Sequence, residues 1–96
     1  MNRIKSFKNK STETIYNGDF AKDLPADIQS VALRKLIMID NAATLNDLRV
    51  PPGNKLEALN GDRTGQFSIR INDKYRICFK CVDAGFEELE IVDYHK

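Results

Sequence analysis

The chain has 96 residues, of which 42% are hydrophobic and 30% are charged, and its formal net charge at pH 7 is +1. These values are typical of one small globular domain, which we place at residues 1–96, and they exclude a low-complexity chain. The near-neutral charge also excludes a general electrostatic attraction to nucleic acid, so any binding of polyanions must come from local clusters of charge.

The N-terminal part of the sequence predicts a short strand followed by a helix. Residues 4–7 form the strand candidate, and Ser11 or Thr12 can cap a first helix that stops near residues 17–18. No segment reaches the ~20 apolar residues that a membrane span needs. The basic N-terminus lacks the apolar core of a signal peptide, so we expect a cytoplasmic protein that does not bind membranes.

A second, longer helix is predicted after Pro25, which suits the first turn of a helix. Its apolar residues recur at helical spacing and form one stripe; they are Ile28, Val31, Ala32, Leu36 and Ile39. Residues 41–43 end this helix. Thr44 can then cap a single turn that runs through Leu48, and residues 50–54 form a loop.

The second half of the sequence predicts only strands and turns. The expected strands are residues 56–59, 67–71, 75–82 and 86–95, separated by turns at residues 60–62, 72–74 and 83–85. The order of elements predicts an α+β fold with a short N-terminal strand, two to three helices and a mainly antiparallel twisted sheet. The helices are expected to cover one face of this sheet.

The hairpin at residues 67–77 raises a question of charge. If its apolar residues share one face, Ile71 lies opposite Tyr75, and Arg70 then lies opposite Arg76. Like charges that face each other across a strand pair are destabilising. Two explanations stay open: an anion such as phosphate bridges the arginines, or Glu88 or Glu90 on the last strand neutralises them.

The face of the hairpin away from the helices is expected to be open, concave and basic. It would carry Gln66, Ser68, Arg70, Arg76, Cys78 and Lys80. Between residues 49 and 80 the basic residues outnumber the acidic ones seven to three, whereas the charged residues between 82 and 94 are all acidic. Ordinary pairing of charges across the strands would explain this pattern equally well.

Cys78 and Cys81 form a C-x-x-C motif, but it falls inside a predicted strand. Residues three apart on a strand point to opposite faces, so one metal ion or one disulfide could not easily use both. We therefore expect two structural thiols that are buried or half-buried, and no metal site. His95, the only histidine, is usually inert at such a terminal position, although its pKa would suit a proton carrier.

The segment GNKLEALNGDRTGQFSIRINDKYRICF, followed later by EIVDYH, resembles a known family. It is similar to the HigB-type toxins of the RelE superfamily, within which the GraT-like or "killer protein" branch is the most similar. The resemblance covers most of the chain and is weakest over the first 25 residues.

This resemblance implies a small α+β toxin of a type II toxin–antitoxin module that cleaves mRNA on the translating ribosome. It implies an endoribonuclease that needs no metal or other cofactor. The expected partners are the ribosome, mRNA and a cognate HigA-like antitoxin with a helix-turn-helix domain, through which alone the toxin would reach operator DNA.

The resemblance also implies roles for individual residues. Arg76 would bind the scissile phosphate, and Asp93, Tyr94 and His95 match the family's acid–base and base-stacking groups. Glu57 is the candidate proton partner. The RNA-binding candidates are Arg63, Arg70, Lys55 and Lys80.

The sequence departs from the family pattern at three positions. Glu57 stands where many members have histidine, Asn60 where many have lysine, and Phe67 where tryptophan or histidine is common. The first change removes one candidate proton carrier, although the carboxylate of Glu57 can also act as a base, and the second removes an RNA contact. They leave open a toxin that binds the ribosome or RNA without cleaving it, or a binding module whose arginines pair with acidic groups of an antitoxin.

Overall fold

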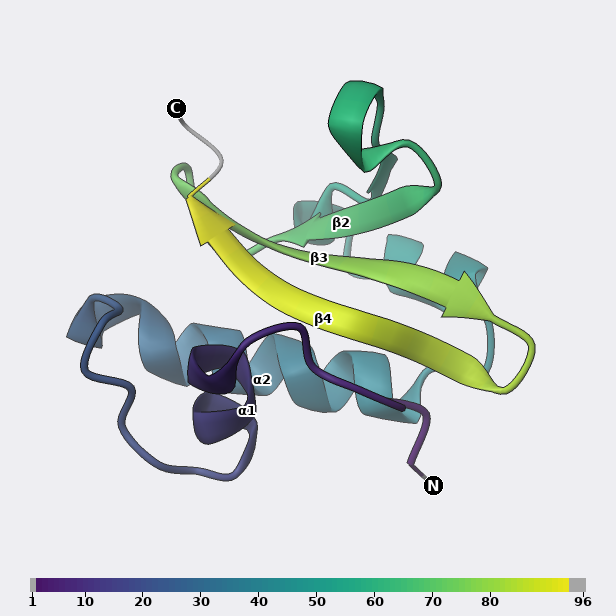
Figure 1. Ribbon diagram of the computed structural model, residues 1–96. Coiled ribbons are helices and arrows are strands. Elements are labelled where there is room, and N and C mark those ends of the chain that lie inside the picture. The colour runs from purple at the N-terminus through teal and green to yellow at the C-terminus, as the bar shows by residue number, and fades with distance from the viewer. Residues whose placement is uncertain (1, 94–96) are drawn as a thin grey trace.

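The computed structural model describes residues 2–93, and in this range both α-helices precede the four strands of the sheet (Figure 1). The helical elements are α1 (Lys10–Tyr16), α2 (Ala26–Asn41) and three 3-10 turns, η1 (Leu45–Arg49), η2 (Pro52–Asn54) and η3 (Gly61–Arg63). The strands are β1 (Glu57–Ala58), β2 (Gln66–Arg70), β3 (Tyr75–Val82) and β4 (Gly85–Asp93). This order confirms the predicted α+β class.

The four strands form one antiparallel sheet in the order β1-β2-β3-β4. The predicted hairpin register is confirmed, because Arg70 pairs with Arg76 and the Ile71 N–H donates to the Tyr75 carbonyl at 2.9 Å. Asn72 shapes the loop, since its Oδ1 accepts from the N–H groups of Lys74 and Tyr75, both at 2.8 Å. A side chain that mimics a turn carbonyl in this way fixes a tight connection.

The predicted N-terminal strand is only partly present. Ile4 and Phe7 each form an isolated parallel bridge with β4, to Phe86 and Leu89 respectively. Backbone hydrogen bonds support both bridges, and the segment runs beside β4 in Figure 1. The carboxylate of Asp40 on α2 also accepts from the N–H groups at residues 3 and 4, which ties this segment to the second helix.

The first helix begins earlier than predicted because Asn9, and not Ser11 or Thr12, is its cap. The Asn9 Oδ1 accepts from the Thr12 N–H at 3.1 Å, and such a bond satisfies one of the otherwise unpaired N–H groups of a first turn. Thr12 is buried, and its hydroxyl accepts from the Ile91 N–H at 3.0 Å. This threonine therefore joins α1 to β4.

A bulge in β4 lets two apolar residues three apart reach the same side of the sheet. The register with β3 shifts between Cys78 and Lys80, and Glu88 has a positive φ of 54°. As a result, Phe86 and Leu89 are both buried, although strict alternation would send them to opposite faces.

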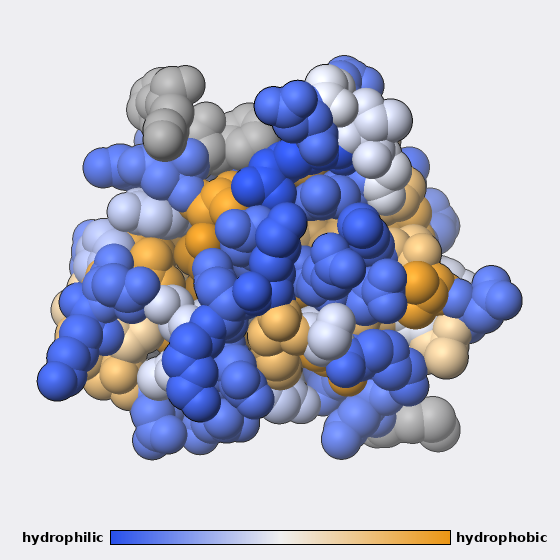
Figure 2. All heavy atoms as spheres, viewed as in Figure 1, coloured by the Kyte–Doolittle hydropathy of each residue, from blue (hydrophilic) through white to orange (hydrophobic). Residues whose placement is uncertain are grey.

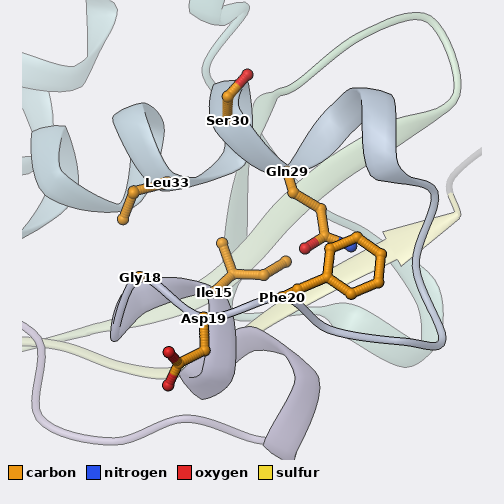
Figure 3. A pocket seen from close by; sticks show the side chains of 7 residues that line it. All are labelled: Ile15, Gly18, Asp19, Phe20, Gln29, Ser30 and Leu33. Atoms are coloured by element: carbon orange, nitrogen blue, oxygen red, sulfur yellow. The ribbon is translucent and has the colours of Figure 1, made fainter.

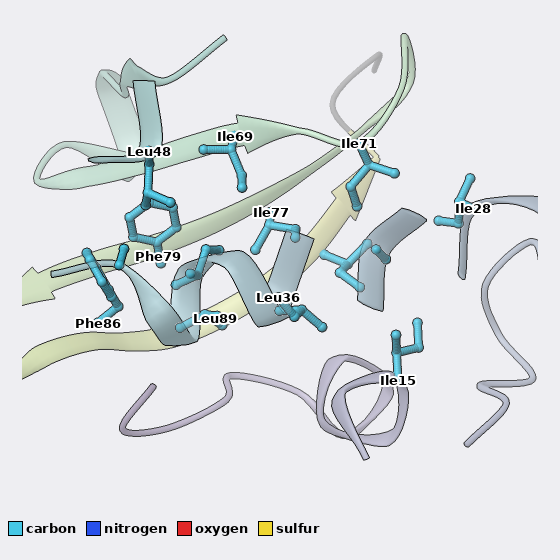
Figure 4. Close-up of a cluster of buried hydrophobic side chains, with 14 of the residues drawn as sticks. Ile15, Ile28, Leu36, Leu48, Ile69, Ile71, Ile77, Phe79, Phe86 and Leu89 are labelled. Carbon is cyan, nitrogen blue, oxygen red and sulfur yellow. The ribbon is translucent and has the colours of Figure 1, made fainter. Parts of the chain in front are cut away.

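The core lies between the sheet and the helices, as Figure 4 shows. The predicted stripe of α2 is confirmed, because Ile28, Ala32, Leu36 and Ile39 are buried against the inner side chains of the strands. The face seen in Figure 2 is mostly hydrophilic, with small hydrophobic patches between polar side chains. Within residues 2–93 no helix has the length and apolar content to cross a membrane.

Candidate active site

Four polar side chains line up across the sheet on the face away from α2. The register pairs Glu57 with Ser68, Ser68 with Cys78, and Cys78 with Glu90, so this row crosses all four strands. Ser68 and Cys78 at its centre are fully buried. Arg63 and Arg76 cover these four side chains, and we call the six residues together the polar row.

Arg76 lies diagonally across from Glu57 and is only 8% exposed. Its Nε donates to the Ser68 Oγ at 2.7 Å, and its Nη2 donates to the Lys55 carbonyl at 2.5 Å. The same Nη2 lies 3.2 Å from the Glu57 Oε1, which forms an ion pair with it. A buried guanidinium is stable when a carboxylate and further acceptors replace its hydration, and these three residues supply both.

The repulsion between Arg70 and Arg76 is therefore relieved by two carboxylates, one on β1 and one in the hairpin loop. Arg76 pairs with Glu57, and Arg70 pairs with Asp73 in the hairpin loop. The prediction that Glu88 or Glu90 neutralises these arginines is wrong in its partners, although charge pairing is the correct kind of explanation. The described residues thus supply a carboxylate for each arginine of the pair.

The two acidic residues of β4 pair with other cations. The Glu90 Oε1 lies 3.1 Å from the Arg63 Nη1, which also donates to the Gln66 Oε1 at 3.1 Å. Glu88 at the bulge lies 3.4 Å from the Lys80 Nζ. Lys80, Gln66 and Arg70 keep partial exposure, but the centre of this face is buried, so the expectation of an open basic surface is wrong at its centre.

Cys78 lies beneath these charges and is not a reactive group. Burial raises the pKa of its thiol; the cations of Arg63 and Arg76 oppose that shift, and the nearby carboxylates add to it. Cys81 is exposed, contrary to the expectation of half-burial, and both cysteines are free thiols. Within the described residues no group of histidine, cysteine and acidic side chains could hold a metal ion.

Comparison with known proteins places the chain in a family. Residues 5–95 match the family described as the RelE-like toxin of the type II toxin–antitoxin system HigB. The chain belongs to this HigB-like toxin family. It is 42% identical to Toxin HigB-1 of Vibrio cholerae serotype O1 over 91 residues, which cover 94% of this chain and 95% of that protein.

A second relative of this HigB-like toxin is Endoribonuclease HigB of Proteus vulgaris. The two are 32% identical over 92 residues, which are 96% of this chain and 99% of that protein. Among solved structures, the YoeB–YefM complex from Staphylococcus aureus contains a chain with a TM-score of 0.58 and 20% identity. That likeness covers 98% of this chain and 99% of the other, and it supports the RelE-like fold.

The structure of the HigB-like toxin brings some of the predicted site residues together and separates others. Glu57 and Arg76 are in contact, and the Lys55 backbone, not its exposed side chain, completes their contact. Asp93 at the end of β4 lies 3.8 Å from the Lys74 Nζ. Tyr94 and His95 lie outside the described residues, so their predicted roles stay predictions.

Sequence reasoning placed Ser68 on this face but gave it no role. Its position on β2, two residues from Arg70 and therefore diagonal to Arg76, was the available signal, since diagonal neighbours on one sheet face are within reach of long side chains.

A separate hollow of about 230 Å³ lies between α1, the loop after it and α2 (Figure 3). It is lined by Ile15, Gly18, Asp19, Phe20, Gln29, Ser30 and Leu33, among which Phe20 is 61% exposed. This lining is largely apolar and contains no arginine, lysine or histidine, so it does not suit phosphate. It shares no residue with the polar row.

Proposed function

We propose that this chain is an endoribonuclease toxin that cleaves mRNA on the ribosome, with Arg76 as the group that binds the scissile phosphate. The observation that carries the proposal is a fixed guanidinium beside a carboxylate, Arg76 beside Glu57, in a chain of the HigB-like toxin family. The name of the Proteus vulgaris relative, Endoribonuclease HigB, supports the reaction class.

The proposed reaction uses the nucleophile that RNA carries. The 2′-oxygen attacks the adjacent phosphorus, the bond from phosphorus to the 5′-oxygen breaks, and a 2′,3′-cyclic phosphate forms. Negative charge grows on the phosphoryl oxygens during this step. A guanidinium that is already oriented stabilises that charge, and one such preorganised donor is worth ~10²–10³ in rate.

The Glu57 ion pair is the part of this arrangement that can open. Glu57 belongs to a two-residue edge strand and its side chain is 47% exposed, whereas Arg76 and Ser68 are buried. In the proposed mechanism a phosphate oxygen replaces the carboxylate at the Arg76 Nη2. The released carboxylate then takes the proton of the 2′-hydroxyl, a role worth ~10²–10⁴ in rate.

The family resemblance supplies the remaining proton groups. His95 and Tyr94 are proposed to protonate the 5′-oxygen that leaves, or Tyr94 stacks on a base and orients it. Asp93 is proposed to orient a neighbour, since it lies near Lys74 at the end of β4. Arg63, Arg70, Lys55 and Lys80 are the proposed contacts to the RNA backbone.

One observation favours a second function, in which the toxin blocks the ribosome without cutting RNA. The cations at residues 63, 70, 74, 76 and 80 each form an ion pair with a carboxylate of the chain. A surface whose charges are already satisfied binds phosphate only by exchange. This arrangement suits recognition of a partner as well as it suits catalysis.

Primer extension on mRNA from a reconstituted translation reaction tests the two functions against each other. Cleavage predicts discrete new 5′ ends, which a 2′-deoxy nucleotide at the cut site abolishes. Intact message with arrested ribosomes would establish blocking and refute the nuclease.

The matched variants are Arg76→Ala, Arg76→Lys and, as the control, Lys22→Ala. Lys22 is exposed in the segment between α1 and α2, which is not part of the polar row. We expect Arg76→Ala to lower cleavage by ~10²-fold or more. Arg76→Lys should rescue little, because an ammonium cannot reproduce the planar fork. Full activity in a folded Arg76→Ala chain would refute the phosphate role.

We further propose that the chain is neutralised in the cytoplasm by a HigA-like antitoxin with a helix-turn-helix domain. Two findings support a partner of this kind: the family is described as the toxin of a toxin–antitoxin system, and the similar Staphylococcus aureus chain belongs to a YoeB–YefM complex. Co-expression with the product of the adjacent gene, followed by size-exclusion chromatography and operator binding, tests it. An operator shift by the toxin alone would contradict DNA contact through the antitoxin only.

A further inference from the structure

A buried side-chain amide joins the second helix to the segment that holds Arg76. Asn54 is the last residue of η2 and is 0% exposed. Its Nδ2 donates to the Leu48 carbonyl at 3.0 Å and lies 3.2 Å from the Met38 sulfur, and its Oδ1 accepts from the Lys35 Nζ. The amide thus connects α2, η1 and η2 through groups that are buried or, at Met38, partly buried.

Lys35 is an unusual donor for such a bond. It is only 9% exposed, and among the described residues no carboxylate forms an ion pair with it. Burial lowers the pKa of its ammonium, and the nearby cations Arg34 and Arg70 lower it further. A buried charge at this place is costly, so its hydrogen bond to Asn54 is the interaction that compensates part of that cost.

The residue after this amide carries an acceptor for Arg76. Lys55 has the left-handed backbone angles φ 49° and ψ 51°, and its N–H donates to the Pro52 carbonyl at 3.0 Å. Its own carbonyl accepts from the Arg76 Nη2 at 2.5 Å, and Glu57, two residues on, forms the ion pair. Two of the oxygen groups that orient the guanidinium therefore lie within three residues of the buried amide.

We propose that Asn54, held in place by Lys35, is a positioning residue for Arg76. The amide sets where the chain leaves the core, the left-handed turn at Lys55 sets the direction of its carbonyl, and that carbonyl with Glu57 sets the orientation of the guanidinium. The inference rests on the proposed function, because it matters for cleavage only if Arg76 binds the phosphate.

The chain offers a matched control elsewhere. Gln29 is also a buried amide on α2, and it pins a different segment through bonds with the Ala21 N–H at 3.0 Å, the Ala21 carbonyl at 2.7 Å and the Leu24 carbonyl at 3.0 Å. That segment lies between α1 and α2 and is not part of the polar row. Gln29→Ala therefore removes a comparable interior amide without touching the support of Arg76.

The direct readout is the Nε–Hε NMR signal of Arg76 and its rate of exchange with water. In the native chain this proton is bonded to the buried Ser68 Oγ, so it should exchange slowly. Asn54→Ala and Lys35→Met should shift the signal and speed exchange by at least about tenfold, since exchange follows local opening. Lys35→Met serves as the milder variant if Asn54→Ala fails to fold.

The second readout is cleavage of mRNA on purified ribosomes. Small displacements of a catalytic group cost ~10²-fold in rate, so we expect both variants to lower kcat by about 10-fold to 100-fold with little change in KM. Gln29→Ala should leave kcat and the Arg76 signal unchanged, even if it destabilises the fold as much as Asn54→Ala or Lys35→Met does.

The outcomes separate this inference from the proposed function. An unchanged Arg76 signal in the folded variants overturns the positioning role, and so does an equal change in Gln29→Ala. If the signal changes as expected but Arg76→Ala still cleaves RNA, the positioning role stands and the proposed function fails.

Discussion

The carboxylate of Asp40 should carry a large share of the stability of the N-terminal segment. It is buried near the end of α2, and its Oδ1 accepts from the N–H groups of Arg3 at 2.8 Å and Ile4 at 3.0 Å. Its Oδ2 accepts from the Tyr16 hydroxyl at 2.5 Å. Asp40→Asn keeps the shape of the side chain and removes its charge, so it isolates the contribution of the carboxylate.

The expected loss follows from the hydrogen bonds. A bond to a charged group contributes ~1.5–3 kcal/mol to stability and a neutral one ~0.5–1.5 kcal/mol. Two backbone bonds that become neutral should therefore cost about 2 kcal/mol in total at pH 7. For a chain of this size such a loss lowers the melting temperature by about 8–16 °C.

The pH dependence of the unfolding free energy gives an independent check that the Asp40 carboxylate stabilises the fold. Burial alone would raise the pKa of Asp40, but bonds from Tyr16, Ile4 and Arg3 outweigh it and hold the pKa below the ordinary value of 3.8. A depressed folded-state pKa adds stability that is fully present above the unfolded pKa and is lost as pH falls through the folded one. The difference between native chain and variant should thus be constant from pH 5 to 8 and shrink below about pH 4.

Urea unfolding followed by circular dichroism at pH 7, 5 and 3.5 measures this difference. Asp23→Asn is the control, because Asp23 is exposed and its carboxylate accepts from the Ser11 hydroxyl at 2.5–2.6 Å, a bond at the surface. Equal stability of Asp40→Asn and the native chain at pH 7, or a difference that persists unchanged at pH 3.5, would refute the reasoning.

Two further predictions concern a glycine and the cysteines. A Cβ at Gly85 would lie 2.0 Å from the Arg3 carbonyl oxygen, and its φ is +152°, so Gly85→Ala should cost about 3 kcal/mol by thermal unfolding. Gly53→Ala, with open space around the added atom, should change stability by less than about 0.5 kcal/mol, and equal effects would contradict this. A thiol reagent should label only Cys81 in the folded chain and both cysteines in urea, since Cys78 is buried and Cys81 is exposed; two rapid equivalents in the folded chain would be inconsistent with this difference in burial.

The hairpin was predictable because its information is local. Alternating apolar residues fix which face each strand buries, and a slip of one residue would expose them all. This constraint by itself predicts that Arg70 lies opposite Arg76, and the register agrees. The stripe of α2 was predictable for the same reason, since its period of about 3.6 residues is written in the sequence.

The bulge in β4 could not be read from the sequence. Glutamate has no preference for a left-handed backbone, so nothing marks Glu88 as the extra residue. The bulge is favoured because it lets both Phe86 and Leu89 be buried, and this packing exists only once the core has formed. The cap at Asn9 was missed for a simpler reason, because several capping residues stand close together at this point.

The sequence pointed to Glu57, Arg63 and Arg76 but did not show which of the charged groups would pair. Glu57 reaches Arg76 only because β1 pairs with β2 in the sheet. The spacing of the two residues in the sequence does not indicate this contact. Arg63 reaches Glu90 across 27 positions in the same way. The charge pattern of the sequence left pairing of opposite charges as one of two explanations, and the sheet topology determines which charges pair.

This choice of partners has a consequence for RNA binding under the proposed function. A free nuclease gains affinity when its cations neutralise phosphates and release their counterions. Here the Arg76 guanidinium already has Glu57, and Arg63 has Glu90, so binding exchanges one anion for another and the gain is small. The net charge of +1 offers little long-range attraction in addition. A toxin built in this way should bind free RNA weakly, and presentation of the mRNA by the ribosome would supply the positioning that its own charges do not.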